Sequence, residues 1–331
     1  MKTTVLSVSE VTDRAGLELL HAIDAAAADH DFLALPVGPI EERVPDLGGV
    51  DIAGTLRHRY LAVEDGTPVG TLLIELPTRD NLATASLDGT IHPDHRRRGL
   101  GRELATWAVE EAARLGRTIL WFQVPAPLDG SDGPAEQLLR DLGAKPVLHE
   151  SRRLLDLRSV ELLPPAPVAE GYRAEQWLDR TPDELVDGVA YLQGRMSIDA
   201  PSGEMSLEQE AWDAKRVREK EAHGLEVGRQ HMVTVVVHEA TGDVAGLTEL
   251  AVSLNEPEVA YQWETIVDRP HRGHRLGLAL KTWNHQLLAA TSPATRWVNT
   301  WNADSNHFMV SVNEACGFRQ TERWVAYELK L

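Results

Sequence analysis

The chain has 331 residues, a formal net charge of −18, 43% hydrophobic residues and 25% charged residues. The length suits two domains of about 150 residues, and the composition is ordinary for globular proteins. The excess of negative charge would repel phosphate backbones, which argues against nucleic acid as a partner.

Other features of the composition narrow the class further. No apolar run approaches the roughly 20 residues that cross a bilayer, and the first residues lack the long apolar core of a signal peptide. A single cysteine, Cys316, excludes an internal disulfide framework. The histidines are scattered without metal-ligand spacing, so we expect no bound metal. The expectation is a cytoplasmic protein without membrane contacts, as a monomer or a homodimer.

In chain order, the first half opens with an alanine- and leucine-rich helical pattern from residue 13 to residue 28. Alternating apolar residues on both sides of Asp65-Gly66 then predict a hairpin. The next expected elements are a strand, a helix, a strand, a short helix and a last strand, at residues 85–91, 100–115, 118–124, 134–142 and 152–157.

The second half repeats this order after a longer helical opening. That opening runs from residue 182 to about residue 221 and is interrupted near Pro201. The later elements are a hairpin, a strand, a helix and a strand, at residues 232–237 with 244–252, 261–267, 276–290 and 296–301. A final helix is expected to be capped by Asp304 or Ser305 and to end at Gly317.

A proline-rich segment separates the two halves. Prolines in Leu163–Pro167 disfavour helix and sheet and predict an extended connector. We therefore predict domains at residues 1–160 and 171–331, joined by a linker at residues 161–170. Both domains belong to the α/β class, and each is expected to hold a mostly antiparallel, mixed sheet flanked by helices.

One short loop occurs twice, at an offset of 176 residues. His95–Gly101 reads His-Arg-Arg-Arg-Gly-Leu-Gly, and His271–Gly277 reads His-Arg-Gly-His-Arg-Leu-Gly. Each copy follows a predicted strand and opens a predicted helix, where unpaired N–H groups and the helix dipole attract an anion. Asp88 and Glu264 each lie eight residues before the first arginine of their loop, so the neighbourhood is duplicated as well. Two copies of one domain, each built around a phosphate-bearing ligand, are the prediction.

The element order, together with a loop of the form Arg/Gln-x-x-Gly-x-Gly/Ala, resembles the GNAT superfamily of acetyl-CoA-dependent N-acetyltransferases. In the first copy, Arg96, Gly99 and Gly101 take the three signature positions. The resemblance covers most of the chain, and the two-domain layout is similar to the tandem GNAT proteins common in actinobacteria.

The second loop departs from the signature at one position. Arg272 and Gly277 match, but Arg275 stands where the first glycine is expected. Gly273, two residues earlier, is a second source of backbone freedom. An ordinary strand–turn–helix corner is the alternative for this copy.

The resemblance implies where acetyl-CoA binds in each domain. The strand before the loop would splay from its neighbour, and the pantetheine arm would pair with backbone at Ile91 and His92 or at Val267 and Asp268. The pyrophosphate would lie on the loops, whose expected contact residues are Arg96, Arg97, Arg98, Gly99, Leu100, Gly101 and Arg102, and Arg272, Gly273, His274, Arg275, Leu276 and Gly277. Asn302 and Asn306 flank a helix start and either line the pantetheine or cap the helix.

Acetyl transfer to an amine needs a base for the amine proton and a donor for the oxyanion, but no covalent enzyme intermediate. Cys316 is accordingly expected to be a small buried residue. Glu264 is the first candidate for the base, and a solvated strand residue is the alternative. Asp88 is its counterpart in the first copy, and Glu249 on the preceding strand is a reserve candidate.

The general acid is harder to place. Many GNAT enzymes have a tyrosine four residues before a Gly-Phe pair, where it protonates the CoA thiolate. That position holds Asn313 in the second copy and Leu139 in the first, and neither side chain can protonate a thiolate. Asn313 can still hydrogen-bond it. Tyr261 and Tyr327 are other candidates, with core packing as the alternative for both.

These residues together predict transfer of an acetyl group from acetyl-CoA to a primary amine of a small molecule, by direct attack in a ternary complex. The second domain is the expected catalyst, and the first is expected to bind cofactor at most. A non-catalytic acyl-CoA-binding or interaction protein that retains the fold is the alternative.

Overall fold

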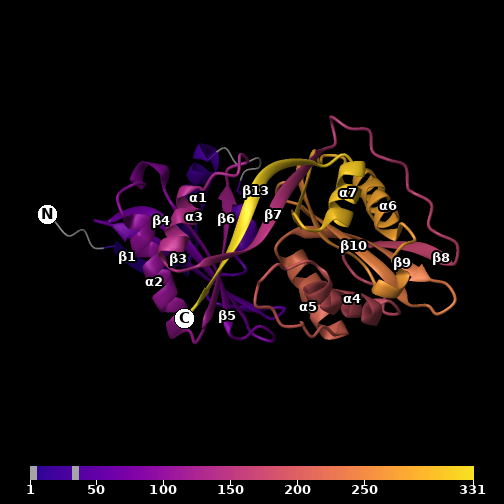
Figure 1. Ribbon diagram of the computed structural model, residues 1–331, viewed down its shortest axis with the longest axis horizontal. Coiled ribbons are helices and arrows are strands. Elements are labelled where there is room, and N and C mark those ends of the chain that lie inside the picture. Colours follow the sequence, from indigo (N-terminus) through magenta and orange to yellow (C-terminus); the bar gives the residue numbers. More distant parts are fainter. Residues whose placement is uncertain (1–5, 32–36) are drawn as a thin grey trace. The chain divides into compact units, whose positions relative to one another are not determined.

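The computed structural model describes residues 6–31 and 37–331, which form two compact units, each a sheet with helices on both faces (Figure 1). The first unit comprises Met1–His149, Gly203–Ser206 and Glu322–Leu331. The second comprises Glu150–Ser202 and Leu207–Thr321. Within the described residues, no helix combines the length and the apolar character that crossing a membrane requires.

The sheet of the first unit is antiparallel apart from one pair of strands. Its order is β1 (Leu6–Glu10), β3 (Thr55–Glu64), β4 (Thr67–Pro77), β5 (Thr84–Ile91), β6 (Ile119–Ala126) and β13 (Arg319–Lys330), with β2 (Asp51–Ile52) paired to β3. β5 and β6 are the parallel pair. Three helices cover this sheet: α1 (Arg14–His30), α2 (Leu100–Arg114) and α3 (Pro134–Asp141). Leu61 packs with α1 and its neighbour Tyr60 with α2, so these helices lie on opposite faces.

The second unit repeats this arrangement with one more helix. Its strand order is β7 (Lys145–Asp156), β12 (Trp297–Ala303), β11 (Val259–Val267), β10 (Val244–Ser253), β9 (Arg229–His238) and β8 (Tyr172–Leu178), of which β11 and β12 are parallel. One face carries α4 (Val186–Asp199) and α5 (Ala214–Glu226), and the other carries α6 (Leu276–Thr291) and α7 (His307–Ala315) (Figure 1).

Each half of the chain gives its last strand to the other unit. β13 pairs with β6 of the first unit, and residues 150–156 of β7 pair with β12 of the second. The units therefore differ from the predicted domains, since residues 150–160 lie in the second unit and residues 322–331 in the first. The proline-rich segment is irregular, as expected, and lies along α6, where the Ala166 amide donates to Thr282 Oγ1 at 2.9 Å.

The helices and most of the central strands lie where the hydrophobic periodicity predicts them, but β13 was not predicted. α1 begins after Asp13, whose carboxylate accepts from the Gly16 amide at 2.8 Å. The predicted cap of α7 is wrong: Asn306 accepts from the Met309 amide at 3.2 Å, while Asp304 accepts from Ser151 Oγ at 2.5 Å. The edge strands β1 and β8 were not predicted, because short and half-exposed strands leave little alternation in the sequence.

A lysine lies inside the core of the second unit. Lys281 on α6 is 1% exposed, and its Nζ lies 5.4 Å from the centre of the Phe318 ring. Among the described residues, no carboxylate lies within ion-pair distance of it. Burial lowers the pKa of Lys281 to about 8, and burial together with Lys281 lowers the pKa of His285 to about 3. Cys316 is buried close by, as expected, and burial raises the pKa of its thiol.

We expect Lys281→Met to stabilise the second unit by about 2 kcal/mol at pH 7, because methionine fills the same space without a charge to desolvate. The lowered pKa means that the cost of burying the ammonium is complete below about pH 8 and disappears as the pH rises toward 10.5. Denaturant unfolding of both proteins at pH 7 and at about pH 9.5 measures this, with the exposed Lys215→Met as control. An advantage that is equal at both pH values would contradict the assignment.

Candidate functional site

The parallel strands of each unit pair over only part of their length. β11 and β12 pair from Val259 opposite Trp297 to Tyr261 opposite Asn299, and no further pairing is formed among the described residues beyond Tyr261. In the first unit, β5 and β6 pair as far as Leu87. Beyond these points the strands separate and leave backbone groups that an extended ligand can pair with.

The two loops have the same backbone conformation despite their different sequences. Arg97 and Gly99 have positive φ angles of 63° and 92°, and Gly273 and Arg275 have positive φ angles of 88° and 57°. Glycine and arginine have therefore exchanged places at two left-handed positions. Each arginine in this conformation costs about 1 kcal/mol. The departure from the signature at Arg275 leaves the geometry of the second loop intact.

The loops present N–H groups at the first turns of α2 and α6. In the described part of the chain, no protein acceptor pairs with the N–H groups of residues 97–101 or 273–277. A Cβ placed on Gly277 would meet no atom within 4 Å, so the second loop has open space beside these donors. Unpaired N–H groups at a helix N-terminus suit a phosphate or diphosphate.

The signature arginines hold the loops in place rather than facing an anion. Arg96 Nε donates to the Ile91 carbonyl at 2.9 Å, and its terminal nitrogens donate to Asp31 at 2.6 and 3.0 Å. In the second unit, Arg272 Nε donates to the Val267 carbonyl at 3.0 Å and its Nη2 to Asp199 at 2.9 Å. Each arginine ties its loop to the preceding strand and helix, which corrects the expected phosphate contact by these side chains.

Some of the other predicted loop side chains have partners of their own. Three contact a carboxylate or a ring: Arg98 lies 2.8 Å from Glu64, Arg102 lies 2.5 Å from Asp141, and the His274 ring lies 5.4 Å from the Tyr172 ring. Leu100 and Leu276 are buried in the cores, so only their backbone is available to a ligand.

The expected pairing positions at the strand ends are also occupied. The His92 amide donates to the Val69 carbonyl and the Asp268 amide to the Ala245 carbonyl, both at 2.9 Å. The carbonyls of Ile91 and Val267 accept from the signature arginines. The open part of each strand therefore begins earlier than predicted, directly after Leu87 and Tyr261.

β11 contains a bulge that its counterpart in the first unit lacks. The register with β10 shifts between Thr248 and Leu250, so that Trp263 and Glu264 lie opposite the single residue Glu249. β4 and β5 of the first unit pair without a shift. A bulge leaves one residue outside the ladder and redirects its backbone groups and side chain. The second unit therefore has an irregular backbone in the open part of the strand.

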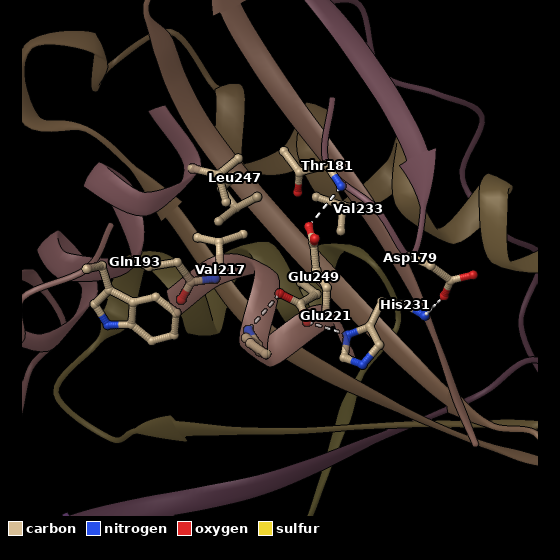
Figure 2. Close-up of a pocket in the computed structure, with 12 residues that line it drawn as sticks. Asp179, Thr181, Gln193, Val217, Glu221, His231, Val233, Leu247 and Glu249 are labelled. Carbon is tan, nitrogen blue, oxygen red and sulfur yellow. Dashed lines mark hydrogen bonds and ion pairs between the residues drawn. The ribbon is translucent and has the colours of Figure 1, made fainter. Parts of the chain in front are cut away.

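Glu264 belongs to a charged cluster beneath α4 and α5. Lys220 Nζ lies 2.9 Å from Glu249 Oε2 and 3.5 Å from both carboxylate oxygens of Glu264. His231 Nδ1 lies 2.6 Å from Glu249 Oε1, and Figure 2 shows these two side chains in contact. Leu247 and Ile266, two residues from Glu249 and Glu264 along their strands, pack on α4, so both carboxylates face this side of the sheet.

Charge compensation decides the protonation of this cluster. Burial alone would lower the pKa of Lys220, but Glu249 and Glu264 raise it. Burial alone would raise the pKa of Glu249, but Lys220 and His231 lower it. The lysine is thus held as an ammonium group and Glu249 as a carboxylate at neutral pH.

Two cavities meet at this cluster. Lys220, Glu249 and His231 line the inner one (Figure 2). The second is an open groove of about 410 Å³, lined by Gln193, Met196, Ser197, Glu210, Trp212 and Glu264. Gln193 and Trp212 line both cavities, so these two side chains form the partition between them. Glu264 therefore faces the groove, while Glu249 faces the interior.

The candidate acids are placed unfavourably. Asn313 is fully buried and its Nδ2 donates to Asn302 Oδ1, so these two asparagines bind each other. Asn306 is the helix cap described above. Tyr261 is the last residue of β11 that pairs with β12, and its ring lies 6.2 Å from that of Trp263. Tyr327 belongs to the first unit and is buried there, where its hydroxyl donates to Glu136 at 3.4 Å.

Asp88 of the first unit is the first residue of β5 beyond the segment that pairs with β6. Its side chain reaches solvent, yet the surrounding protein raises its pKa to about 6, and Asp24 and Glu75 add to this rise. Among the described residues, no cation lies within ion-pair distance of it. Asp88 therefore has other carboxylates nearby, whereas its counterpart Glu264 has the ammonium group of Lys220 nearby.

The sequence analysis missed Lys220, His231 and the groove residues. A lysine or histidine on an amphipathic element has no motif spacing, and burial on a helix face is its only distinction. One signal was present: Gly224 lies four residues after Lys220, and a glycine inside a helix indicates a close neighbour. That neighbour is the His231 ring.

The comparisons with known proteins agree with this geometry. Residues 31–133 match the model of the acetyltransferase (GNAT) family. The chain carries a GNAT acetyltransferase domain. No curated protein sequence matches the chain. The fold of the whole chain is that of a tandem GNAT protein.

Three solved structures illustrate this similarity. A tandem GNAT protein from the clavulanic acid biosynthesis pathway, solved without acetyl-CoA, is 29% identical with a TM-score of 0.81 over 98% of each chain. A GCN5-related N-acetyltransferase from Sphaerobacter thermophilus is 18% identical, with a TM-score of 0.71 over 98% of this chain and 95% of that one. A fungal multi-domain GH3 β-N-acetylglucosaminidase with a GCN5-related glucosamine N-acetyltransferase region is 12% identical, with a TM-score of 0.70 over 99% of this chain and 38% of that one. The last two show the fold alone.

We expect Gly224→Ala to destabilise the second unit by about 1–2 kcal/mol. The new methyl group would overlap His231 Nε2 and lie 2.8 Å from its Cδ2, while Glu249 holds the ring from the other side. Overpacking of about 1–3 kcal/mol outweighs the gain of up to about 1 kcal/mol from removing a helical glycine. Denaturant unfolding measures this. In a His231→Ala background the same substitution should become neutral or stabilising, and an equal loss in both backgrounds would contradict the packing argument.

Proposed function

We propose that the protein is an acetyl-CoA-dependent N-acetyltransferase that acts on a primary amine of a small molecule, and that the second unit is the catalyst. The observation that carries the proposal is the position of Glu264. Its carboxylate lines an open groove, at a bulge in the strand that leads directly to an intact anion-binding loop. A candidate base, a bulge and an anion site thus lie along one strand.

The residues present fit the diphosphate and pantetheine of acetyl-CoA. The open space beside Gly277 and the unpaired N–H groups of residues 273–277 suit the diphosphate, and the separated strands suit the extended arm. When bound, acetyl-CoA supplies an activated acetyl group. Glu264 would take the proton of the acceptor amine, directly or through water, and the N–H at the bulge would stabilise the developing oxyanion.

The groove favours an acceptor that is cationic and partly apolar. Glu210 and Glu264 contribute carboxylates, and Trp212 and Met196 contribute apolar and aromatic surface. Asn313 cannot donate a proton to the leaving thiolate, so water takes this role. In the first unit the strand has no bulge. We accordingly assign acyl-CoA binding without catalysis to that unit.

The lack of an acid near the groove supports a second candidate, a non-catalytic acyl-CoA-binding protein. Both loops keep the anion-binding conformation, whereas the buried pair of Asn302 and Asn313 replaces the proton donor. Turnover separates the two candidates, because only the enzyme releases free CoA thiol when an amine is added.

We expect Glu264→Gln to lower kcat/KM by about 100-fold with little change in acetyl-CoA affinity, because the amide keeps the shape of the side chain but cannot accept the amine proton. A thiol-release assay over a panel of cationic amines measures this, with the exposed Glu239→Gln as the matched control. Full activity of Glu264→Gln would remove Glu264 as the base.

The two loops can be tested separately by calorimetry with acetyl-CoA. We expect Gly277→Glu to lower the affinity for acetyl-CoA at the second loop by at least about tenfold, and Gly101→Glu to do the same at the first loop. In each variant a carboxylate then occupies the anion site. A Cβ on either glycine meets no atom closer than 3.8 Å, and an acidic residue suits the first turn of a helix, so neither substitution threatens the fold. Unchanged stoichiometry and affinity in both variants would show that the loops bind no diphosphate.

A further inference from the structure

We propose that Lys220 is a positioning residue for Glu264: its ammonium group, shared with Glu249, holds the Glu264 carboxylate in the anionic, groove-facing form that accepts a proton. The inference rests on the proposed function in one respect, the role of Glu264 as the base. It goes beyond that role by identifying Lys220 as the group on which the charge and orientation of the Glu264 carboxylate depend.

The geometry places the lysine between the two carboxylates. Its Nζ is equidistant from both oxygens of Glu264, at 3.5 Å, and closer to Glu249, at 2.9 Å. Two carboxylates on opposite strands at one bulge repel each other, and the ammonium group between them removes this repulsion. The ammonium group of Lys220 thus compensates the charge of both carboxylates.

The two cavities lie on different sides of the cluster. Lys220 lines the inner cavity, whereas Glu264 lines the outer groove. The carboxylate of Glu264 therefore meets the lysine from the interior and an acceptor amine from the groove. An amine that enters the groove can reach Glu264 without displacing the lysine, whose charge Glu249 and Glu264 hold in place.

Other charged groups around this cluster have separate partners. Glu249 binds His231 at 2.6 Å on the interior side. Further charged side chains line the two cavities or border them, from the β8–α4 connection, the segment before α5 and α5 itself: Asp179, Glu210, Arg216 and Glu221. Asp179 accepts from the His231 amide, Glu221 pairs with Arg218, and Glu210 lies 3.6 Å from Arg216. Lys220 is thus the cation that serves Glu264 directly.

The first unit supplies an internal comparison. Asp88 occupies the position of Glu264 in the duplicated strand, and no lysine bridges it to a neighbouring carboxylate in the described part of the chain. The pKa of Asp88 is raised to about 6. Among the described residues, Asp88 thus has no counterpart of the cation that pairs with Glu264.

The decisive measurement is the titration of the Glu264 carboxyl by NMR of the full chain, labelled with carbon-13 at glutamate carboxyls and assigned with Glu264→Gln. We expect Lys220→Met to move this titration to higher pH by about one to two units. Lys220→Arg should restore it because the charge returns. Lys215→Met, which removes an exposed lysine of the same helix, should leave it unmoved. An unmoved titration in Lys220→Met overturns the proposal.

A second variant predicts the opposite sign. Glu249→Gln leaves the ammonium group to Glu264 alone, so the same titration should move to lower pH. A shift upward, or none, overturns the proposal even if Lys220→Met fails to fold. The titration needs no turnover, so it also separates this inference from the proposed function. If the protein is inactive but shows both shifts, the proposed function is wrong and the inference about Lys220 stands. In an active protein, the acid limb of the pH–rate profile should follow the two shifts.

Discussion

The parting of β11 from β12 after Tyr261 is the constraint on which the rest of the second unit depends. Backbone groups inside a sheet need partners, and strands that stop pairing create a demand that another chain segment or a ligand must meet. Here the parting coincides with a bulge, which adds one more unpaired residue to the same stretch. The bulge turns Glu264 toward α4 and α5, and the strand then continues into the anion-binding loop. The candidate base, the open part of the strand and the loop therefore all lie along β11 and its continuation.

The duplicated loops show that a backbone conformation can be retained while its sequence motif is not. Glycine is the usual residue at a left-handed position, yet each loop places arginine at one such position and glycine at the other. A cost of about 1 kcal/mol is small beside the interactions that hold the loop, which include an arginine bound to a strand carbonyl and to a helix carboxylate in both copies. The motif is therefore less informative about function than the conformation.

The sequence predicted the order of elements, the duplication and the position of Glu264 on the strand before the loop, because periodicity and motif spacing are local properties. It did not predict that Arg96 and Arg272 bind carboxylates, since positive charge in a loop says nothing about which anion is nearest. It also left Tyr327 as a candidate acid for the second domain. Only strand pairing, a contact between residues far apart in the chain, assigns that tyrosine to the first unit. Lys220 was missed for the same reason, because its two carboxylate partners come from other elements.

The two copies have diverged in electrostatics more than in backbone. Both keep the separated strands and the loop, but only the second has a lysine bridging the carboxylate of the open strand to a second one, among the residues that the structure describes. A carboxylate that must accept a proton at neutral pH has to be anionic before the acceptor arrives, and burial opposes that state. In the first unit, nearby carboxylates add to the rise in the pKa of Asp88, whereas in the second Lys220 lies between Glu249 and Glu264. The two copies thus differ in the charged side chain that a helix brings to the open strand, without a change of fold.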